Sequence, residues 1–251
     1  MRVALVCLCL LVSAASAALT AEPQARESKA STAAKLNAQL GIAYLQRGNV
    51  ALAQQKIERA LSENAGDPDV QTAAALLYDQ VGEYDKASTH YQAAMRADPS
   101  DPNRANNYGG FLCRRGSFDR GQKLLEETAS NRRYATPEVA LTNAGVCARQ
   151  GKNLERAEQD FRKALEINGA YSDALLQMAD LGYTRGDMIM ARGFLSRLLG
   201  TSPPSAEALL LGFKIEKSAG DARAAKEYGD RLRREFPDAP QVRELNEAAS
   251  P

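Results

Sequence analysis

The sequence predicts an all-α solenoid of six stacked helical hairpins, from its composition, a recurring glycine and a recurring pair of small and bulky residues. Good helix formers dominate the chain, whereas aromatic residues make up 6% and tryptophan is absent. Glycine recurs at intervals of 34, 34, 35, 35 and 34 residues, at Gly48, Gly82, Gly116, Gly151, Gly186 and Gly220. A period of this length is typical of helix pairs that bury their apolar faces against one another.

Small and bulky residues flank these glycines at fixed distances. A small residue precedes most of them by seven positions, at Gly41, Ala75, Gly109 and Ala179. After each glycine comes another small residue, and four residues later usually a bulky one: Ile57, Tyr91, Leu125, Phe161 or Leu195. Small residues let two helices cross closely, and the bulky residue fills the space beside them. The glycine is expected to end the first helix in a left-handed conformation.

This frame resembles the tetratricopeptide repeat, whose consensus runs L-G-x-x-Y, A-x-x-x-F and P. Leu40-Gly41 with Tyr44, and Ala157 with Phe161, match it. The resemblance implies a right-handed superhelical solenoid. The predicted units within residues 34–239 are 34–67, 68–101, 102–137, 138–171, 172–205 and 206–239, followed by a C-terminal cap and tail at 240–251. The third unit carries an insertion, and the sixth departs from the frame at Phe213 and Gly229.

The N-terminus predicts export. Met1-Arg2 is followed by an unbroken apolar run from Val3 to Val12 and by small residues up to Ala17. This order is typical of a signal peptide, predicted here at residues 1–17. The polar residues 18–33 lack periodicity and are predicted to form a flexible leader. In an exported chain the pair Cys113 and Cys147 predicts a disulfide between the third and fourth units.

The remaining residues do not indicate catalysis. Lys plus Arg (32) and Asp plus Glu (31) nearly cancel, which gives no electrostatic reason to expect a nucleic acid partner. No nucleotide-binding or hydrolase motif occurs. A single histidine, His90, leaves little acid–base capacity and, with two cysteines in the body, no four-ligand zinc site. We expect a protein-binding scaffold without enzymatic activity, cofactor, metal or small-molecule substrate.

A partner is expected along the first helices, which in this repeat line a concave groove. The ninth position of each unit should face it: Ile42, Leu76, Gly110, Val146, Asp180 and Lys214. The groove is therefore predicted to be apolar at its N-terminal end, around Ile42, Leu45 and Leu76, and charged at its C-terminal end. An amphipathic or extended peptide would suit the apolar end. Alternatively, Ile42 and Leu76 only pack neighbouring repeats together.

The most distinctive sequence motifs occur in the third and fourth units. The third begins Asn106-Asn107-Tyr108-Gly109-Gly110-Phe111-Leu112-Cys113, and the fourth echoes it as Asn143-Ala144-Gly145-Val146-Cys147. Asn107 and Asn143 occupy the same repeat position. Because asparagine is a poor residue inside a helix, its recurrence indicates side-chain hydrogen bonds, either to a ligand backbone or between the two helices.

With these paired motifs, residues 34–240 resemble the type IV pilus biogenesis/stability proteins of the PilF/PilW type, the pilotins of the pilus secretin. The resemblance implies a lipoprotein of the outer membrane that binds secretin subunits, promotes their localisation and ring assembly, and so supports twitching motility. Asn106, Asn107, Tyr108, Gly109, Phe111, Leu112, Asn143 and Gly145 are the residues that carry the family motif.

The N-terminus departs from this family, whose members are lipidated on a cysteine at the signal cleavage site. Neither Cys7 nor Cys9 lies in a recognisable lipobox. Either the true start lies upstream of Met1, or the protein is a periplasmic form whose membrane association would require a lipid that it lacks. A different function also stays open, that of a periplasmic adaptor for cell-envelope or peptidoglycan enzymes.

Overall fold

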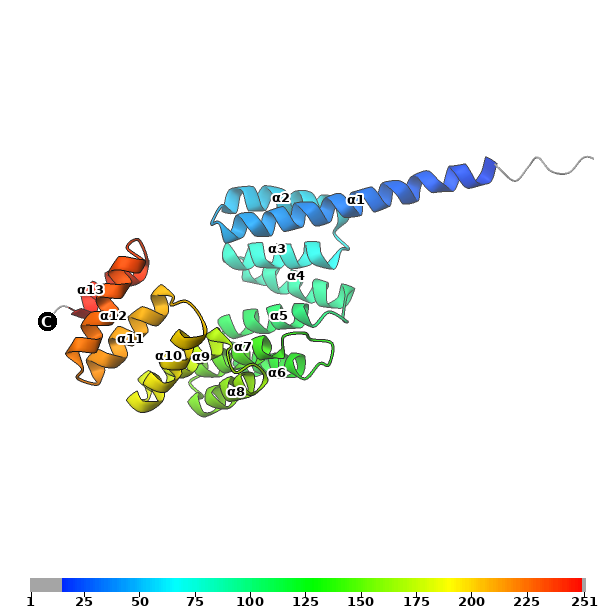
Figure 1. Cartoon of the computed structure of the whole chain (residues 1–251). Coiled ribbons are helices and arrows are strands. Elements are labelled where there is room, and N and C mark those ends of the chain that lie inside the picture. Colours follow the sequence, from blue (N-terminus) through cyan, green and yellow to red (C-terminus); the bar gives the residue numbers. More distant parts are fainter. Residues whose placement is uncertain (1–14, 250–251) are drawn as a thin grey trace, which may run out of the picture. The chain divides into compact units, whose positions relative to one another are not determined.

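A computed structural model describes residues 15–249, and every regular element in that range is a helix (Figure 1). The predicted all-α class is thereby confirmed. The helices in chain order are α1 (Ala15–Gln46), α2 (Val50–Asn64), α3 (Pro68–Gln80), α4 (Tyr84–Ala97), α5 (Pro102–Arg114), α6 (Phe118–Ala129), α7 (Pro137–Gln150), α8 (Leu154–Ile167), α9 (Ser172–Thr184), α10 (Met188–Thr201), α11 (Ala206–Ser218), α12 (Ala222–Glu235) and α13 (Pro240–Ala249). Within this range no helix combines the length and the hydropathy needed to cross a bilayer.

The chain divides into two compact units, Met1–Ser100 and Asp101–Pro251, which we call unit 1 and unit 2. In unit 1, α1 packs on α2 and α3, and α3 packs on α4. Their shared core is built from alanine and aliphatic side chains, among them the fully buried Ala53, Ile57 and Val70. The small alanine side chains let the helix backbones approach one another closely.

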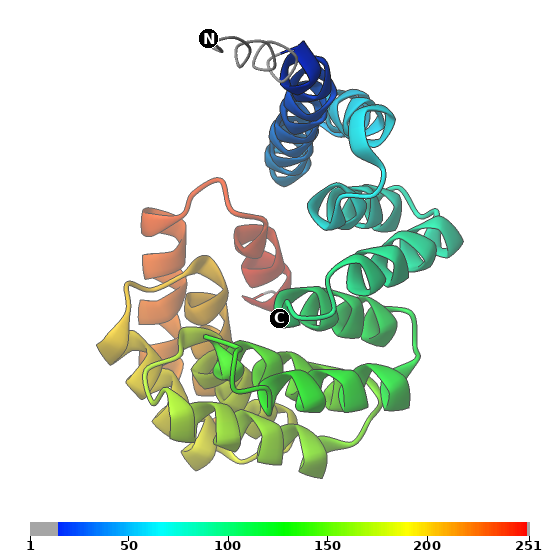
Figure 2. The ribbon, with the colours of Figure 1, turned by 90° about the vertical axis from the view of Figure 1, so that its right-hand side faces the viewer.

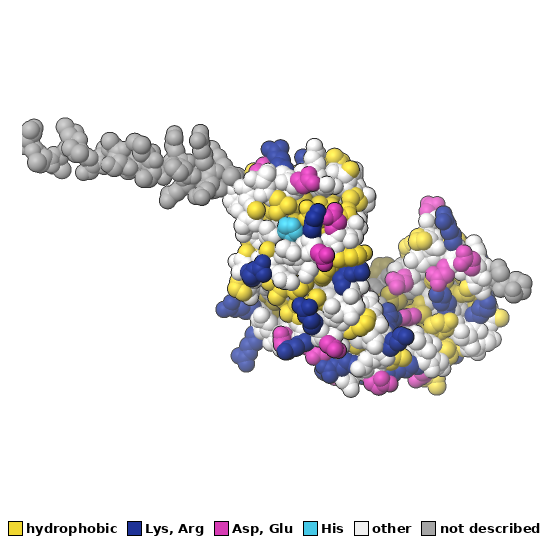
Figure 3. All heavy atoms as spheres, turned by 180° about the vertical axis from the view of Figure 1, so that it is seen from behind, with side chains coloured by type: hydrophobic (Ala, Val, Ile, Leu, Met, Phe, Trp, Pro, Cys, Tyr) yellow, Lys and Arg dark blue, Asp and Glu magenta, His cyan; other side chains and the backbone are white. Residues whose placement is uncertain are grey.

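Unit 2 contains four hairpins, α5–α6, α7–α8, α9–α10 and α11–α12, and the single helix α13, which packs on α11 and α12. Within this unit the hairpins follow one another in a curved row, and α13 lies on its inner side (Figure 2). On the face of unit 2 that Figure 3 shows, positively and negatively charged side chains are interspersed, as expected for helices whose apolar faces are turned inward.

Glycine in a left-handed conformation ends the first helix of five hairpins, with φ between 73° and 82° at Gly48, Gly82, Gly116, Gly186 and Gly220. The prediction was wrong at Gly151, where the left-handed residue is Lys152, with a φ of 64°. Because the connection between α6 and α7 is longer, the first helix of the fourth hairpin does not end at the recurring glycine. Position 152 is therefore the structural equivalent of Gly116.

The N-terminal helix is longer than the repeat frame predicted. It begins at Ala15, so the structure places residues 18–33 in the first half of α1 rather than in an irregular leader. Ten of the sixteen residues in that segment are alanine, glutamate, glutamine, arginine or lysine, all of which favour helix. Residues 1–14, which make up most of the predicted signal peptide, lie outside the described residues.

Candidate functional site

The motif residues of the third hairpin lie on α5 in unit 2. Tyr108, Phe111 and Leu112 are buried, and the rings of Tyr108 and Phe111 stack with their centroids 6.0 Å apart. Asn106 and Asn107 are only partly buried. Most of the motif therefore builds the core of unit 2, and the two asparagines remain accessible on its surface.

Gly109 and Gly145 occupy helix crossings where no side chain fits. A Cβ atom on Gly109 would lie 2.7 Å from Cγ of Leu125, and one on Gly145 would lie 2.4 Å from Cε1 of Phe161. Both distances are far below van der Waals contact. The two motif glycines therefore let α5 pack on α6, and α7 on α8, with a bulky side chain pressed directly against the backbone.

Asn143 joins the two motif helices. Its Nδ2 donates a hydrogen bond of 3.0 Å to Oδ1 of Asn106, which links α7 to α5. The partner is thus Asn106, one residue before Asn107, the repeat equivalent of Asn143. Of the two roles open to these asparagines, this geometry matches the bond between helices. The bond also gives each of the two partly buried amide groups a hydrogen-bond partner, without which their burial would cost free energy.

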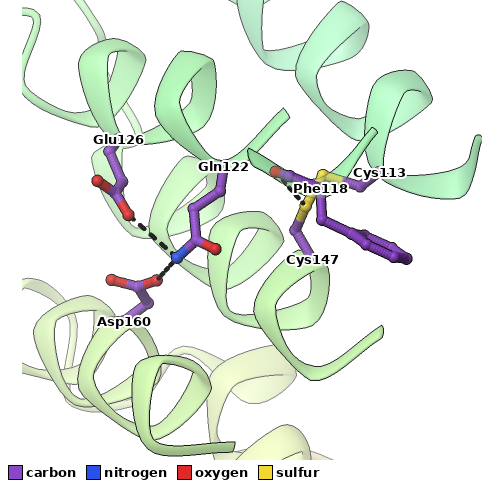
Figure 4. The surroundings of a disulfide bond; sticks show 6 residues. All are labelled: Cys113, Phe118, Gln122, Glu126, Cys147 and Asp160. Atoms are coloured by element: carbon purple, nitrogen blue, oxygen red, sulfur yellow. Dashed lines mark hydrogen bonds between the residues drawn. A yellow bond between two sulfur atoms is a disulfide. The ribbon is translucent and has the colours of Figure 1, made fainter. Parts of the chain in front are cut away.

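A disulfide joins Cys113 of α5 to Cys147 of α7, with 5.2 Å between their Cα atoms (Figure 4). Both cysteines are buried, and Sγ of Cys147 lies 3.6 Å from the carbonyl oxygen of Phe118. Gly121 makes room for the bond, because a Cβ atom at that position would lie 2.4 Å from Sγ of Cys113. The covalent link therefore holds the two motif helices together beside the Asn106–Asn143 hydrogen bond.

A buried carboxylate lies close to the disulfide, between α6 and α8 (Figure 4). Asp160 is completely buried, and its Oδ2 accepts a hydrogen bond of 3.0 Å from Nε2 of Gln122. Arg156 pairs with Glu126 and lies 3.7 Å from Asp160. Burial and the nearby Glu126 charge raise the pKa of Asp160 to about 6, against the opposing effect of Arg156, Lys163 and Gln122. Sequence patterning gave no sign of this network, because the same residue types also cover exposed helix faces.

Asp160→Asn is expected to stabilise the protein above pH 7 by about 3 kcal/mol, from a pKa raised by roughly two units at about 1.4 kcal/mol each. The folded pKa lies above the unfolded value, so ionised Asp160 costs stability above about pH 6. That cost disappears as the pH falls toward the unfolded pKa of 3.8, and the advantage of the variant should shrink with it. Urea denaturation at pH 8 and pH 5 measures the difference.

Glu166→Gln serves as the control, because Glu166 lies exposed on the same helix. Because Glu166 is exposed, its substitution should change the free energy of unfolding by no more than about 0.5 kcal/mol. An Asp160→Asn variant that is less stable than wild type at pH 8, or whose advantage grows at pH 5, would contradict this account of the buried carboxylate.

The three residues predicted to form an apolar groove lie in unit 1. Leu45 is buried, and Ile42 and Leu76 are half-buried and pack against the core of α1, α2 and α3. Much of their apolar surface therefore holds neighbouring repeats together, which was the alternative reading of Ile42 and Leu76. Ile42 and Leu76 also keep part of their surface exposed.

A more exposed apolar surface lies on the neighbouring face of α1. Leu36 is 56% exposed and Leu40 is 47% exposed, one helical turn apart. Their equivalents in the second hairpin, Val70 and Ala74, are both completely buried against the first hairpin. Leu36 and Leu40, here called the apolar end of unit 1, thus occupy a stacking position that no described helix covers. Comparing equivalent positions of the first and second repeats could have found them from the sequence.

The inner side of unit 2 contains a polar pocket of about 210 Å³, lined by residues of α7, α9, α11 and α13. Ion pairs Arg149–Asp180 and Lys214–Glu244 join its walls. Asp180 and Lys214 are the ninth-position residues expected to make the C-terminal end of the groove charged. Gln177 also lines the pocket, and its Oε1 is buried without a hydrogen-bond partner among the described residues.

The other polar side chains give no indication of catalysis. His90 has a structural environment: Nδ1 lies 2.7 Å from Oε1 of Gln71, and the ring stacks on Tyr78. Burial lowers its pKa, and the positive charge of Lys86 lowers it further. Among the side chains that the structure describes, no group of three or more His, Cys, Asp or Glu residues is placed to hold a metal ion.

Stacked hairpins, glycine crossings and an exposed helix face define the chain as a helical-repeat scaffold of the protein-interaction class. The tetratricopeptide repeat family model matches residues 38–102 and 112–174. A type IV pilus assembly protein, PilF of Pseudomonas aeruginosa, is 30% identical over 207 residues, which cover 82% of each chain. The chain therefore belongs to the tetratricopeptide family and, within it, to the PilF/PilW-type proteins of type IV pilus biogenesis.

Solved structures support the same assignment. The chain matches Pseudomonas aeruginosa PilF with a TM-score of 0.67 and 28% identity, over 88% of this chain and 99% of that one. It matches PilW, described as a widely conserved type IV pilus biogenesis factor, with a TM-score of 0.71 and 25% identity, over 84% and 97%. An uncharacterised protein of Haemophilus influenzae is 28% identical over 55% of this chain and 77% of its own length.

Proposed function

We propose that the protein is an exported assembly factor of a type IV pilus, which binds subunits of the outer-membrane secretin in the periplasm. In this role it assists their localisation and multimerisation and thereby supports pilus assembly and twitching motility. The observation that carries the proposal is the match to PilF along 82% of both chains. The protein acts in this proposal as a scaffold, without cofactor or chemical step.

The apolar end of unit 1 is the surface that we assign to the secretin subunit. Leu36 and Leu40 expose about half of their surface, although hydrophobic side chains at this position are buried in the next hairpin. A partner helix or extended segment that covers them would bury apolar area just as the second hairpin does on the other side. In the same unit, Leu45 belongs to the buried core, and Ile42 and Leu76 pack against that core.

Leu36→Glu/Leu40→Glu is expected to abolish binding to the secretin and leave the fold intact, because both side chains are exposed. Binding of the purified protein to the periplasmic part of the secretin measures the effect. Ile189→Glu is the matched control, since Ile189 is 87% exposed on α10 in unit 2. Full binding by the unit 1 variant, or equal loss in the Ile189 control, would reject this surface as the secretin site.

The function itself is tested by deleting the gene. The deletion strain is expected to lose secretin multimers and twitching, and a plasmid copy of the gene should restore both. Normal secretin rings in the deletion strain would contradict the proposal. If the protein purified from cells brings down a peptidoglycan hydrolase or synthase and no secretin, the role of a cell-envelope enzyme adaptor is supported in its place.

A further inference from the structure

In the first five hairpins a small residue on the first helix is followed sixteen positions later by a bulky residue on the second. The pairs are Gly41–Ile57, Ala75–Tyr91, Gly109–Leu125, Gly145–Phe161 and Ala179–Leu195. All five bulky side chains are buried. In the sixth hairpin the order is reversed, because Phe213 stands at the small position and Gly229 at the bulky one.

The sixth hairpin keeps the small–bulky contact but moves it by one residue. A Cβ atom on Gly212 would lie 2.7 Å from the ring of Tyr228, so Gly212 and Tyr228 form the close crossing of α11 and α12. Phe213 and Gly229 therefore do not form the close crossing in this hairpin. Gly229 stands where the earlier hairpins have a bulky residue, and Leu245 of α13 packs beside it.

A hollow of about 420 Å³ lies in the face of α11 and α12, and we call it the sixth-hairpin hollow. Its buried lining includes Phe213, Ala225 and Gly229. At Gly229 the nearest atom to an added Cβ is Cδ1 of Leu245 on α13, at 3.4 Å. The hollow is thus an apolar depression that the chain leaves unfilled, of a size within the range of pockets that hold ligands.

Charged side chains around the hollow are predominantly positive. Lys217, Lys226 and Arg233 line it together with a single carboxylate, Asp230. Lys226 pairs with Asp230, and Arg233 lies 3.6 Å from the same carboxylate. Three cations around one anion leave an excess of positive charge beside an apolar floor. This combination favours an apolar group that carries negative charges on both sides.

We propose that the sixth-hairpin hollow is a second docking site, which takes one bulky apolar side chain from an acidic peptide segment of a partner protein. A phenylalanine or leucine of the partner would occupy the open part of the hollow, against Phe213, Ala225 and Gly229. Flanking aspartate or glutamate side chains would face Lys217, Lys226 and Arg233. Interfaces commonly concentrate their affinity in such a buried anchor. The site goes beyond the proposed secretin contact, which lies in unit 1.

The test uses two substitutions at one position. Gly229→Leu fills the hollow from within, whereas Gly229→Ala adds only a methyl group that meets Leu245 at ordinary contact distance. Both replace a glycine inside a helix, which favours the helix, and urea denaturation verifies that each variant is folded before its binding is compared. Lys226→Glu, at an exposed position of α12, weakens the positive charge and leaves the hollow open.

The probe is a synthetic peptide with one phenylalanine flanked by aspartates, titrated into the full-length protein and followed by the NMR signals of Phe213 and Ala225. We expect binding by wild type and Gly229→Ala, and at least about tenfold weaker binding by Gly229→Leu and Lys226→Glu. A peptide with alanine in place of phenylalanine, or lysine in place of aspartate, should bind correspondingly less.

Three results would overturn the proposal: no binding of the acidic phenylalanine peptide to wild type, equal binding of the alanine peptide, or unchanged binding by Gly229→Leu. Anionic lipid vesicles provide a further comparison. If they shift the same signals and the peptide does not, the hollow is a lipid contact and the peptide site is rejected. None of these results depends on whether the secretin binds unit 1.

Discussion

Phe161→Ala is expected to lower the free energy of unfolding by about 3–5 kcal/mol, the cost of removing a well-packed aromatic side chain from a core. Phe161 is completely buried on α8 and packs with Ala148, Met178 and Leu181 from the neighbouring helices. Its ring also lies against the backbone of α7 at Gly145. Removing it empties the junction between the fourth and fifth hairpins, which has no other bulky side chain at that position.

The control for this variant is Ile167→Ala. Ile167 ends the same helix and is 53% exposed, so its removal should change stability by no more than about 0.5 kcal/mol. Urea denaturation followed by circular dichroism measures both variants. If Phe161→Ala costs no more than Ile167→Ala, the crossing at Gly145 does not hold these hairpins together in the way described.

Gly145→Ala tests the other side of this contact. The added Cβ atom would lie 2.4 Å from the Phe161 ring, and neither α7 nor the ring can move away without disturbing the core. The expected cost is about 1–3 kcal/mol. Because a smaller side chain at position 161 relieves the clash, Gly145→Ala should cost much less in a Phe161→Leu background. Simple additivity of the two substitutions would contradict direct contact between these residues.

Replacing both Cys113 and Cys147 by alanine is expected to lower the free energy of unfolding by about 3–4 kcal/mol. The bond closes a loop with a sequence separation of 34 residues, and cross-linking a loop of this size restricts the unfolded chain by about that amount. The two sulfur atoms are also buried, so the reduced protein gains no compensating contact with water while it stays folded.

Dithiothreitol distinguishes the bond from the packing of the two side chains. The reductant should lower the urea midpoint of wild type toward that of the double alanine variant, and leave the variant unchanged. When the protein is isolated without reductant and then denatured, a thiol-alkylating reagent should modify neither Cys113 nor Cys147. Labelling of both cysteines before reduction, or a wild-type midpoint insensitive to reductant, would show that the disulfide is not formed in solution.

Most of the fold could be predicted from the repeat pattern of the sequence. A small residue followed sixteen positions later by a bulky one dictates a close helix crossing, and in the structure a side chain at Gly41, Gly109 or Gly145 would collide with its bulky partner. The helix-ending glycines were equally informative, except at Gly151. There the longer connection before α7 displaced the frame, so a lysine adopts the left-handed conformation instead.

The repeat pattern of the sequence could not predict features that depend on which residues are neighbours in three dimensions. Asp160 looks in the sequence like any solvated helix acid, yet it is completely buried beside Gln122. Asn143 bonds Asn106 rather than its repeat equivalent Asn107, a pairing that repeat position alone does not predict. In the sixth hairpin, sequence showed that Phe213 and Gly229 break the frame. Only the packing of Gly212 on Tyr228 explains how the hairpin still closes.

The role of the apolar end of unit 1 in secretin assembly is tested most directly in cells that lack the chromosomal gene. The strain is complemented with wild type, with Leu36→Glu/Leu40→Glu, or with Ile189→Glu, and the detergent-resistant secretin multimers are compared at equal levels of each protein. We predict multimers with wild type and with Ile189→Glu, and none with the double variant. Undiminished multimers in cells that carry only Leu36→Glu/Leu40→Glu would contradict the account.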